Sequence, residues 1–170
     1  MKKVITVLLF FSILFLYACS SPVEPKDTIA IPIKVTAKLG GTDAVFTADI
    51  FELGCDITFD SSHPLAGTKL ELREYGNTAT NGDFKRSVVE GIFPAQESLV
   101  KAIRALAETD ISGIETENGV KYTIDEMTIM VYYDKSAKLI TGIETEKDGR
   151  RFDFTVVGLE PYEGQSSSEG

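Results

Sequence analysis

The chain has 170 residues, with 17 Lys and Arg against 26 Asp and Glu, and its formal net charge is −9. Because such an acidic surface repels phosphate groups, nucleic acid is excluded as a partner, and so is docking on anionic lipid through basic side chains. The length suits a single domain that buries enough apolar surface to fold without cross-links.

The first residues have the features of a secretory signal peptide. A basic start leads into an apolar run over residues 4–16, which is too short to span a membrane and is followed by polar residues. The sequence Leu16-Tyr17-Ala18-Cys19 then resembles the lipobox of bacterial lipoproteins, apart from its tyrosine, where the motif usually has a small residue. The resemblance implies that residues 1–18 are removed and that Cys19 carries a diacylglycerol thioether. The protein would then be lipid-anchored on the extracytoplasmic face of the cell membrane or the outer membrane.

The rest of the chain divides into a tether, one domain and a tail. We expect residues 19–27 to form a polar, lipidated tether, residues 28–163 a single β-rich domain, and residues 164–170 a disordered tail. With Cys19 lipidated, Cys55 is the only other thiol, so no internal disulfide is expected. Cys55 lies in an alternating apolar run, which predicts a small buried hydrophobic residue.

The first half of the domain has the two-residue alternation that is typical of β-strands. Residues 29–39 and 44–53 alternate apolar and polar side chains around Gly40-Gly41, which predicts a hairpin. Pro32 lies inside the first run and cannot donate a ladder hydrogen bond, so this strand is predicted at an edge of the sheet. Further alternating runs follow, and Asn81-Gly82 predicts a second hairpin.

Residues 94–109 are predicted to form the one helix of the domain. Pro94 suits the first helical turn, and Leu99, Ile103 and Leu106 form an apolar stripe. Residues 120–159 then contain four alternating runs separated by turns, a meander of antiparallel strands. These elements predict an α+β fold that is mostly antiparallel β. We expect a curved half-barrel sheet of about 8–10 strands with one amphipathic helix packed on its concave face.

Two short motifs accompany this order of elements. Residues 132–140 are followed by a charged turn and Phe152-Asp153-Phe154, and Pro64-Leu65-Ala66-Gly67 precedes a strand. Together with the element order, they resemble the LolA/LolB-like group, which includes periplasmic lipoprotein carriers and small lipoproteins built as open β-barrels with helices on the concave side. The chain departs from the carriers in having no helix before its first strand. The resemblance covers about residues 28–160 and implies a fold, but it assigns no functional residue.

The sequence offers little catalytic chemistry. His63 is the only histidine, and the Ser61-Ser62-His63 run is interpreted as a turn in preference to a nucleophile and its base. Acidic residues such as Asp49 and Asp56 lie at strand positions where we expect a solvated face. No calcium loop or phosphate-binding glycine loop is present. We therefore expect no metal, no cofactor and no enzymatic activity.

Two functions stay open. The first is the binding of a lipid or other hydrophobic ligand in a groove between the helix and the sheet. The residues predicted to line that groove are Leu99, Ile103, Leu106, Phe46, Phe59, Phe152 and Phe154. The same side chains could instead fill the groove as ordinary core. The second function is an envelope interaction module that docks another protein through a sheet edge or an acidic face.

Overall fold

The computed structural model describes residues 24–162, so Cys19, the predicted signal peptide and the tail predicted at 164–170 lie outside the described residues. One 3-10 turn, η1 (Pro25–Thr28), and one longer helix, α2 (Pro94–Glu108), accompany eleven strands in this part of the chain. The strands are β1 (Ile33–Leu39), β2 (Val45–Phe51), β3 (Gly54–Phe59), β4 (Thr68–Arg73), β5 (Asn77–Asn81), β6 (Phe84–Val88), β7 (Ile114–Glu115), β8 (Val120–Ile124), β9 (Met127–Asp134), β10 (Leu139–Lys147) and β11 (Arg150–Pro161).

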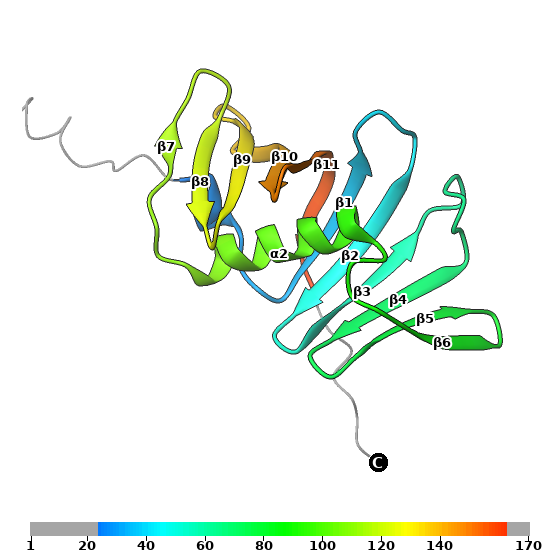
Figure 1. Ribbon diagram of the computed structural model, residues 1–170. Helices are drawn as coiled ribbons and strands as arrows, with labels where there is room; N and C mark the ends of the chain where they lie inside the picture. Colours follow the sequence, from blue (N-terminus) through cyan, green and yellow to red (C-terminus); the bar gives the residue numbers. More distant parts are fainter. Residues whose placement is uncertain (1–23, 163–170) are drawn as a thin grey trace, which may run out of the picture.

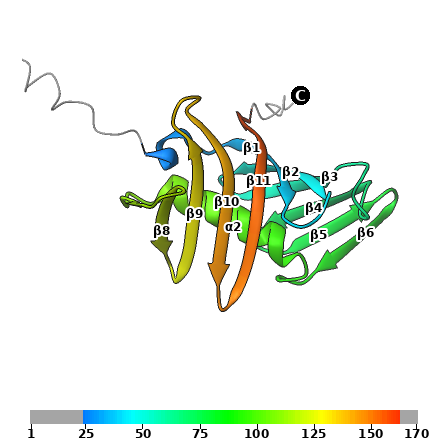
Figure 2. The ribbon, with the colours of Figure 1, turned by 90° about the horizontal axis from the view of Figure 1, so that it is seen from above.

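All eleven strands belong to one open antiparallel sheet. Strands β2 to β6 follow one another on one side of β1, strands β10 to β7 lie on the other side of β11, and β1 pairs with β11 in the middle. The sheet curves around α2, which crosses its concave side (Figures 1 and 2). The predicted half-barrel with a helix on its concave face is therefore confirmed. The strand number exceeds the expected 8–10 because the sheet also includes β7, which has only two residues.

The alternation of side chains places every second residue of the inner strands in the core. Val35 and Ala37 of β1 are buried, as are Phe46 and Ala48 of β2. The helix buries its apolar stripe against the sheet, and the hydroxyl of Ser98 in α2 shares a hydrogen bond of 2.8 Å with the hydroxyl of Thr145 in β10. Helix and sheet thus close one core between them.

Strand β1 is a central strand, and its predicted place at a sheet edge is wrong. It pairs with β2 on one side and with β11 on the other. The ladder begins at Ile33, so Pro32 precedes the strand and its missing N–H removes no ladder hydrogen bond. The carbonyl of Pro32 accepts a hydrogen bond of 3.2 Å from the backbone N–H of Tyr162.

The folded domain also extends further toward the N-terminus than we expected. Residues 24–27, assigned above to the tether, are packed on the domain, and Pro25 is buried. A carboxylate oxygen of Glu24 accepts hydrogen bonds from the backbone N–H of Gly113 at 3.1 Å and from the Tyr122 hydroxyl at 3.3 Å. These contacts attach the start of the described chain to β8 and to the segment before β7.

Candidate functional site

The seven side chains predicted to line an apolar groove come together between α2 and the sheet. Six of them are buried, namely Leu99, Ile103, Leu106, Phe46, Phe59 and Phe154, and Phe152 is half-buried. Phe46 and Phe154 meet edge to face, with ring centroids 6.2 Å apart. This set of residues forms the core between helix and sheet.

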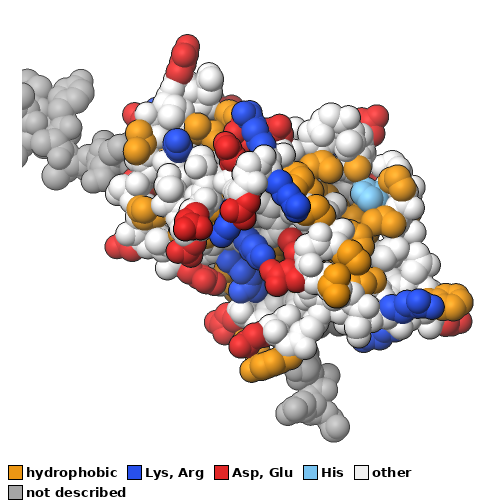
Figure 3. Space-filling model, in the orientation of Figure 1, with side chains coloured by type: hydrophobic (Ala, Val, Ile, Leu, Met, Phe, Trp, Pro, Cys, Tyr) orange, Lys and Arg blue, Asp and Glu red, His pale blue; other side chains and the backbone are white. Residues whose placement is uncertain are grey.

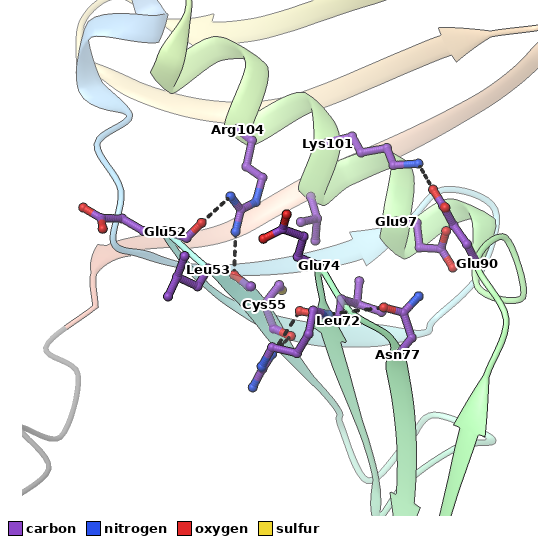
Figure 4. A pocket seen from close by; sticks show the side chains of 13 residues that line it. Glu52, Leu53, Cys55, Leu72, Glu74, Asn77, Glu90, Glu97, Lys101 and Arg104 are labelled. Atoms are coloured by element: carbon purple, nitrogen blue, oxygen red, sulfur yellow. Dashed lines mark hydrogen bonds and ion pairs between the residues drawn. The ribbon is translucent and has the colours of Figure 1, made fainter.

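A groove of about 360 Å³ lies beside this core, where one end of the strands meets α2 (Figure 4). Gly54 pairs with Arg73 and Asn77 pairs with Val88, so the β2–β3 turn, the β4–β5 turn and the end of β6 lie at the same end of the sheet. We call this feature the strand-end groove. The residues that line it are Glu52, Leu53, Gly54, Cys55, Leu72, Arg73, Glu74, Asn77, Glu90, Glu97, Val100, Lys101 and Arg104. None of the seven residues predicted from the sequence is among them.

Arg104 connects the helix to the β2–β3 turn. Its guanidinium donates hydrogen bonds to the backbone carbonyls of Phe51, of Glu52 at 3.1 Å and of Gly54 at 2.7 Å. These carbonyls belong to the turn and its flanking residues. Arg104 therefore holds one wall of the groove in place (Figure 4).

Glu97 fixes the segment that enters the helix. It is 7% exposed, and its two carboxylate oxygens accept hydrogen bonds of 2.9 and 2.8 Å from the backbone N–H of Gly91. One of these oxygens also lies 3.4 Å from the N–H of Phe93, the N-cap residue, whose own side chain offers no acceptor. Across the groove mouth, Lys101 donates to the Glu90 carboxylate at 2.6 Å.

Arg73 is the third cationic residue of the groove lining, after Arg104 and Lys101. Its guanidinium donates to the carbonyls of Cys55 at 2.8 Å and Leu72 at 3.0 Å, and to a carboxylate oxygen of Asp56 at 2.5 Å. It also lies over the ring of Phe51, 4.9 Å from the centroid. All three cations of the lining are thus engaged by protein groups, whereas Glu52 and Glu74 form no ion pair within residues 24–162.

Cys55 lies on the floor of the groove. Its side chain is buried, as the alternating sequence predicted, and burial raises the pKa of the thiol to about 12. The thiol is therefore neutral at physiological pH and contributes apolar surface.

The convex face carries a row of charges across β1 to β4. Asp49 and Asp56 pair across β2 and β3, and Lys34 lies 3.9 Å from Asp49. Asp56 binds Lys69 at 2.8 Å in addition to Arg73. The two carboxylates are partly buried, whereas their partners Lys34 and Lys69 are 42% and 43% exposed, so the ion pairs lie on a face that solvent reaches.

His63 has a structural place in the connection from β3 to β4. Its ring packs on Phe59 with centroids 4.4 Å apart, and its Nδ1 accepts a hydrogen bond of 2.9 Å from the N–H of Leu65. Burial lowers its pKa. No hydrogen bond joins it to Ser61 or Ser62 among the described residues.

Between residues 24 and 162, no three His, Cys, Asp or Glu side chains are grouped so that they could hold a metal ion. No helix in that range has the length and hydropathy of a membrane-crossing segment. No model of a known protein family matches the chain, and no curated protein matches it.

Sequence reasoning missed the groove because its residues come from turns and from the polar side of α2. One signal was present in the sequence, although its meaning depends on the structure: the connections β2–β3 and β4–β5 contain the large apolar residues Leu53 and Tyr75. Turn positions usually hold small or polar residues, so an apolar pair there indicates a surface with a partner.

Proposed function

We propose that this protein is a non-enzymatic docking module of the bacterial cell envelope, and that it binds a partner protein at the rim of the strand-end groove. One observation carries the proposal. Three large apolar side chains from three separate connections are exposed around the same end of the sheet: Leu53 by 76%, Tyr75 by 95% and Val89 by 71%. Apolar side chains that gather beside a groove mark interaction surfaces on soluble domains.

The neighbouring concave surface adds to this support. Figure 3 shows hydrophobic side chains gathered around His63, over the half of the sheet formed by β3 to β6. Ile92, in the connection between β6 and α2, is 51% exposed. The concave side therefore exposes apolar side chains near the β3–β4 connection as well.

Binding of a lipid between helix and sheet has less support. The side chains that such a ligand would contact are packed against one another as core, and charged side chains form much of the lining of the groove beside them. An acyl chain would have to displace that core, which costs the burial of several large side chains. The docking function accounts for the exposed residues without such a rearrangement.

We also propose that a diacylglycerol thioether on Cys19 anchors the domain, and that the protein is a small LolA/LolB-like lipoprotein. The lipobox-like sequence supports the anchor, and the open sheet with its helix supports the resemblance. Mass spectrometry of the protein isolated from membranes should find the diacylglycerol adduct on Cys19, and Cys19→Ala should abolish it. An unmodified Cys19 would contradict the anchor.

The docking surface can be tested in cells with a photocrosslinking amino acid in place of Tyr75 in the full chain. We expect one discrete adduct of defined mass. The double variant Leu53→Ser/Val89→Ser should lose it, because the surrounding apolar rim is removed. The matched control is Leu139→Ser/Val157→Ser, at side chains that are 60% and 64% exposed elsewhere on the sheet. Absence of an adduct, or equal loss in both double variants, would overturn the proposal.

A further inference from the structure

We propose that the strand-end groove binds the side chain of a lysine or arginine that the partner protein presents. The alkyl stem would lie against Leu53, Leu72 and Val100, and the cationic end would lie beside the Glu74 carboxylate. This inference rests on the proposed docking function and adds the chemistry of the residue that enters the groove.

The charges of the lining favour a cation. Lys101 is paired with Glu90 at 2.6 Å, and Arg73 is paired with Asp56 at 2.5 Å. Arg104 is held by backbone carbonyls, and its nearest carboxylate, Glu108, lies 3.8 Å away on the same helix. The buried carboxylate of Glu97 is satisfied by backbone N–H groups. The charge that the described lining leaves without an ionic partner is therefore negative.

Glu74 is the carboxylate best placed to receive the cation. It lies in the β4–β5 turn, and Figure 4 shows its side chain directed toward α2 across the groove, whereas the carboxylate of Glu52 points away. Glu74 is exposed, so a cation that enters the groove can reach its carboxylate. The net charge of −9 also favours the approach of a basic partner.

The size and the walls of the groove suit one long basic side chain. Its volume of about 360 Å³ is near the lower end of the roughly 300–1,000 Å³ typical of pockets for small molecules. Lysine and arginine combine an alkyl stem with a charged end, which matches apolar walls below a carboxylate. An acidic side chain would be repelled by Glu74, and a purely apolar one would cover Glu74 without giving it a partner.

The test is a titration of the isotope-labelled full chain in detergent with three pentapeptides, followed by NMR. The probes are Gly-Val-Lys-Val-Gly and two relatives with norleucine or glutamate at the centre. We expect saturable shifts at the amides of Leu53, Leu72 and Val100 with the lysine peptide. The affinity for the norleucine peptide should be lower by about tenfold, the ratio that one moderately strong charged contact provides. Shifts elsewhere, or equal affinity for norleucine, would overturn the assignment.

Variants separate Glu74 from the general negative charge. Glu74→Gln keeps the shape of the side chain and should lower the affinity for the lysine peptide by about fivefold or more. Glu117→Gln, in the exposed turn before β8, removes the same charge elsewhere and should leave the affinity unchanged. Equal effects of the two variants would contradict a cation site at Glu74. If the Tyr75 adduct in cells persists while the peptide results fail, only the cation site is overturned. If the adduct fails while the peptide binds, only the docking proposal is overturned.

Discussion

Asp49 and Asp56 are cross-strand neighbours with opposite environments. Burial raises the pKa of Asp49, the positive charge of Lys34 opposes that rise, and the smaller effect of the negative charge of Asp56 adds to it. Burial would also raise the pKa of Asp56, but hydrogen bonds from Lys69 and Arg73 outweigh it and lower the pKa below the ordinary value of 3.8. One oxygen of Asp49, Oδ1, is buried without a hydrogen-bond partner among the described residues.

These environments predict opposite effects of two isosteric substitutions. At neutral pH, Asp56→Asn should destabilise the fold by about 1 kcal/mol, the upper end for ion pairs that solvent still reaches. Asp49→Asn should be neutral or stabilising, because it removes a charge that burial disfavours. Urea unfolding monitored by circular dichroism measures both. Destabilisation by Asp49→Asn as large as that by Asp56→Asn would contradict this interpretation.

The same pair predicts a pH dependence. The folded-state pKa of Asp56 lies below 3.8, so its contribution to stability is present above that value and is lost as the pH falls through the folded-state pKa. The folded-state pKa of Asp49 lies above the ordinary value of 3.8. Its ionisation therefore destabilises the fold as the pH rises from 3.8 to the folded-state pKa of Asp49. The difference between wild type and Asp56→Asn should therefore shrink in acid. A difference that stays constant down to the acid transition would count against these ion pairs.

At the scale of elements, the start of α2 depends on Glu97. Glu97→Ala would remove the carboxylate that accepts hydrogen bonds from the part-buried N–H groups of Gly91 and Phe93, which should cost about 1 kcal/mol. Glu97→Gln retains one acceptor oxygen and should cost less. Denaturant unfolding gives these values, with Glu108→Ala near the exposed end of the helix as the control. Similar losses in Glu97→Ala and Glu108→Ala would show that Glu97 has no special role.

Most elements could be predicted because their signals are local. The helix begins at Pro94 and ends within one residue of its predicted end. Pro94 marks the first turn, and Leu99, Ile103 and Leu106 have the spacing of one helical face. The edge position predicted from Pro32 was wrong because the pairing partner of β1 is β11, more than a hundred residues later in the chain. A two-residue alternation of apolar and polar side chains predicts that a strand exists, but it does not predict which strands lie beside it.

At the scale of the whole molecule, the groove could not be predicted for a related reason. Leu53, Tyr75 and Val89 come together only through the register of β2 to β6 and the position of α2. The predicted lining residues are instead the ones whose periodicity is strongest, and strong periodicity indicates core. The proposed docking surface of this chain lies where the alternation stops.

The hairpin of β5 and β6 should be the least stable part of the sheet. None of its strand residues is buried, whereas β2 and β10 contribute several buried side chains each. Native-state hydrogen exchange should therefore find opening free energies for the β5 and β6 amides that lie about 2 kcal/mol or more below those of β1 and β2. Equal protection in both groups would contradict this, and the amides of the central β1–β11 ladder provide the reference.

The pairing of β1 with β11 makes the order of synthesis important for folding. When strands β1 to β6 have left the ribosome, β1 still exposes a full row of unpaired N–H and C=O groups, and it keeps that exposed edge until β11 arrives. The last strand of the described chain thus closes the sheet at its centre rather than at its margin. A chain shortened before Arg150 would leave two half-sheets whose inner edge strands have unpaired backbone groups. Each of these edges could pair with a strand of another molecule.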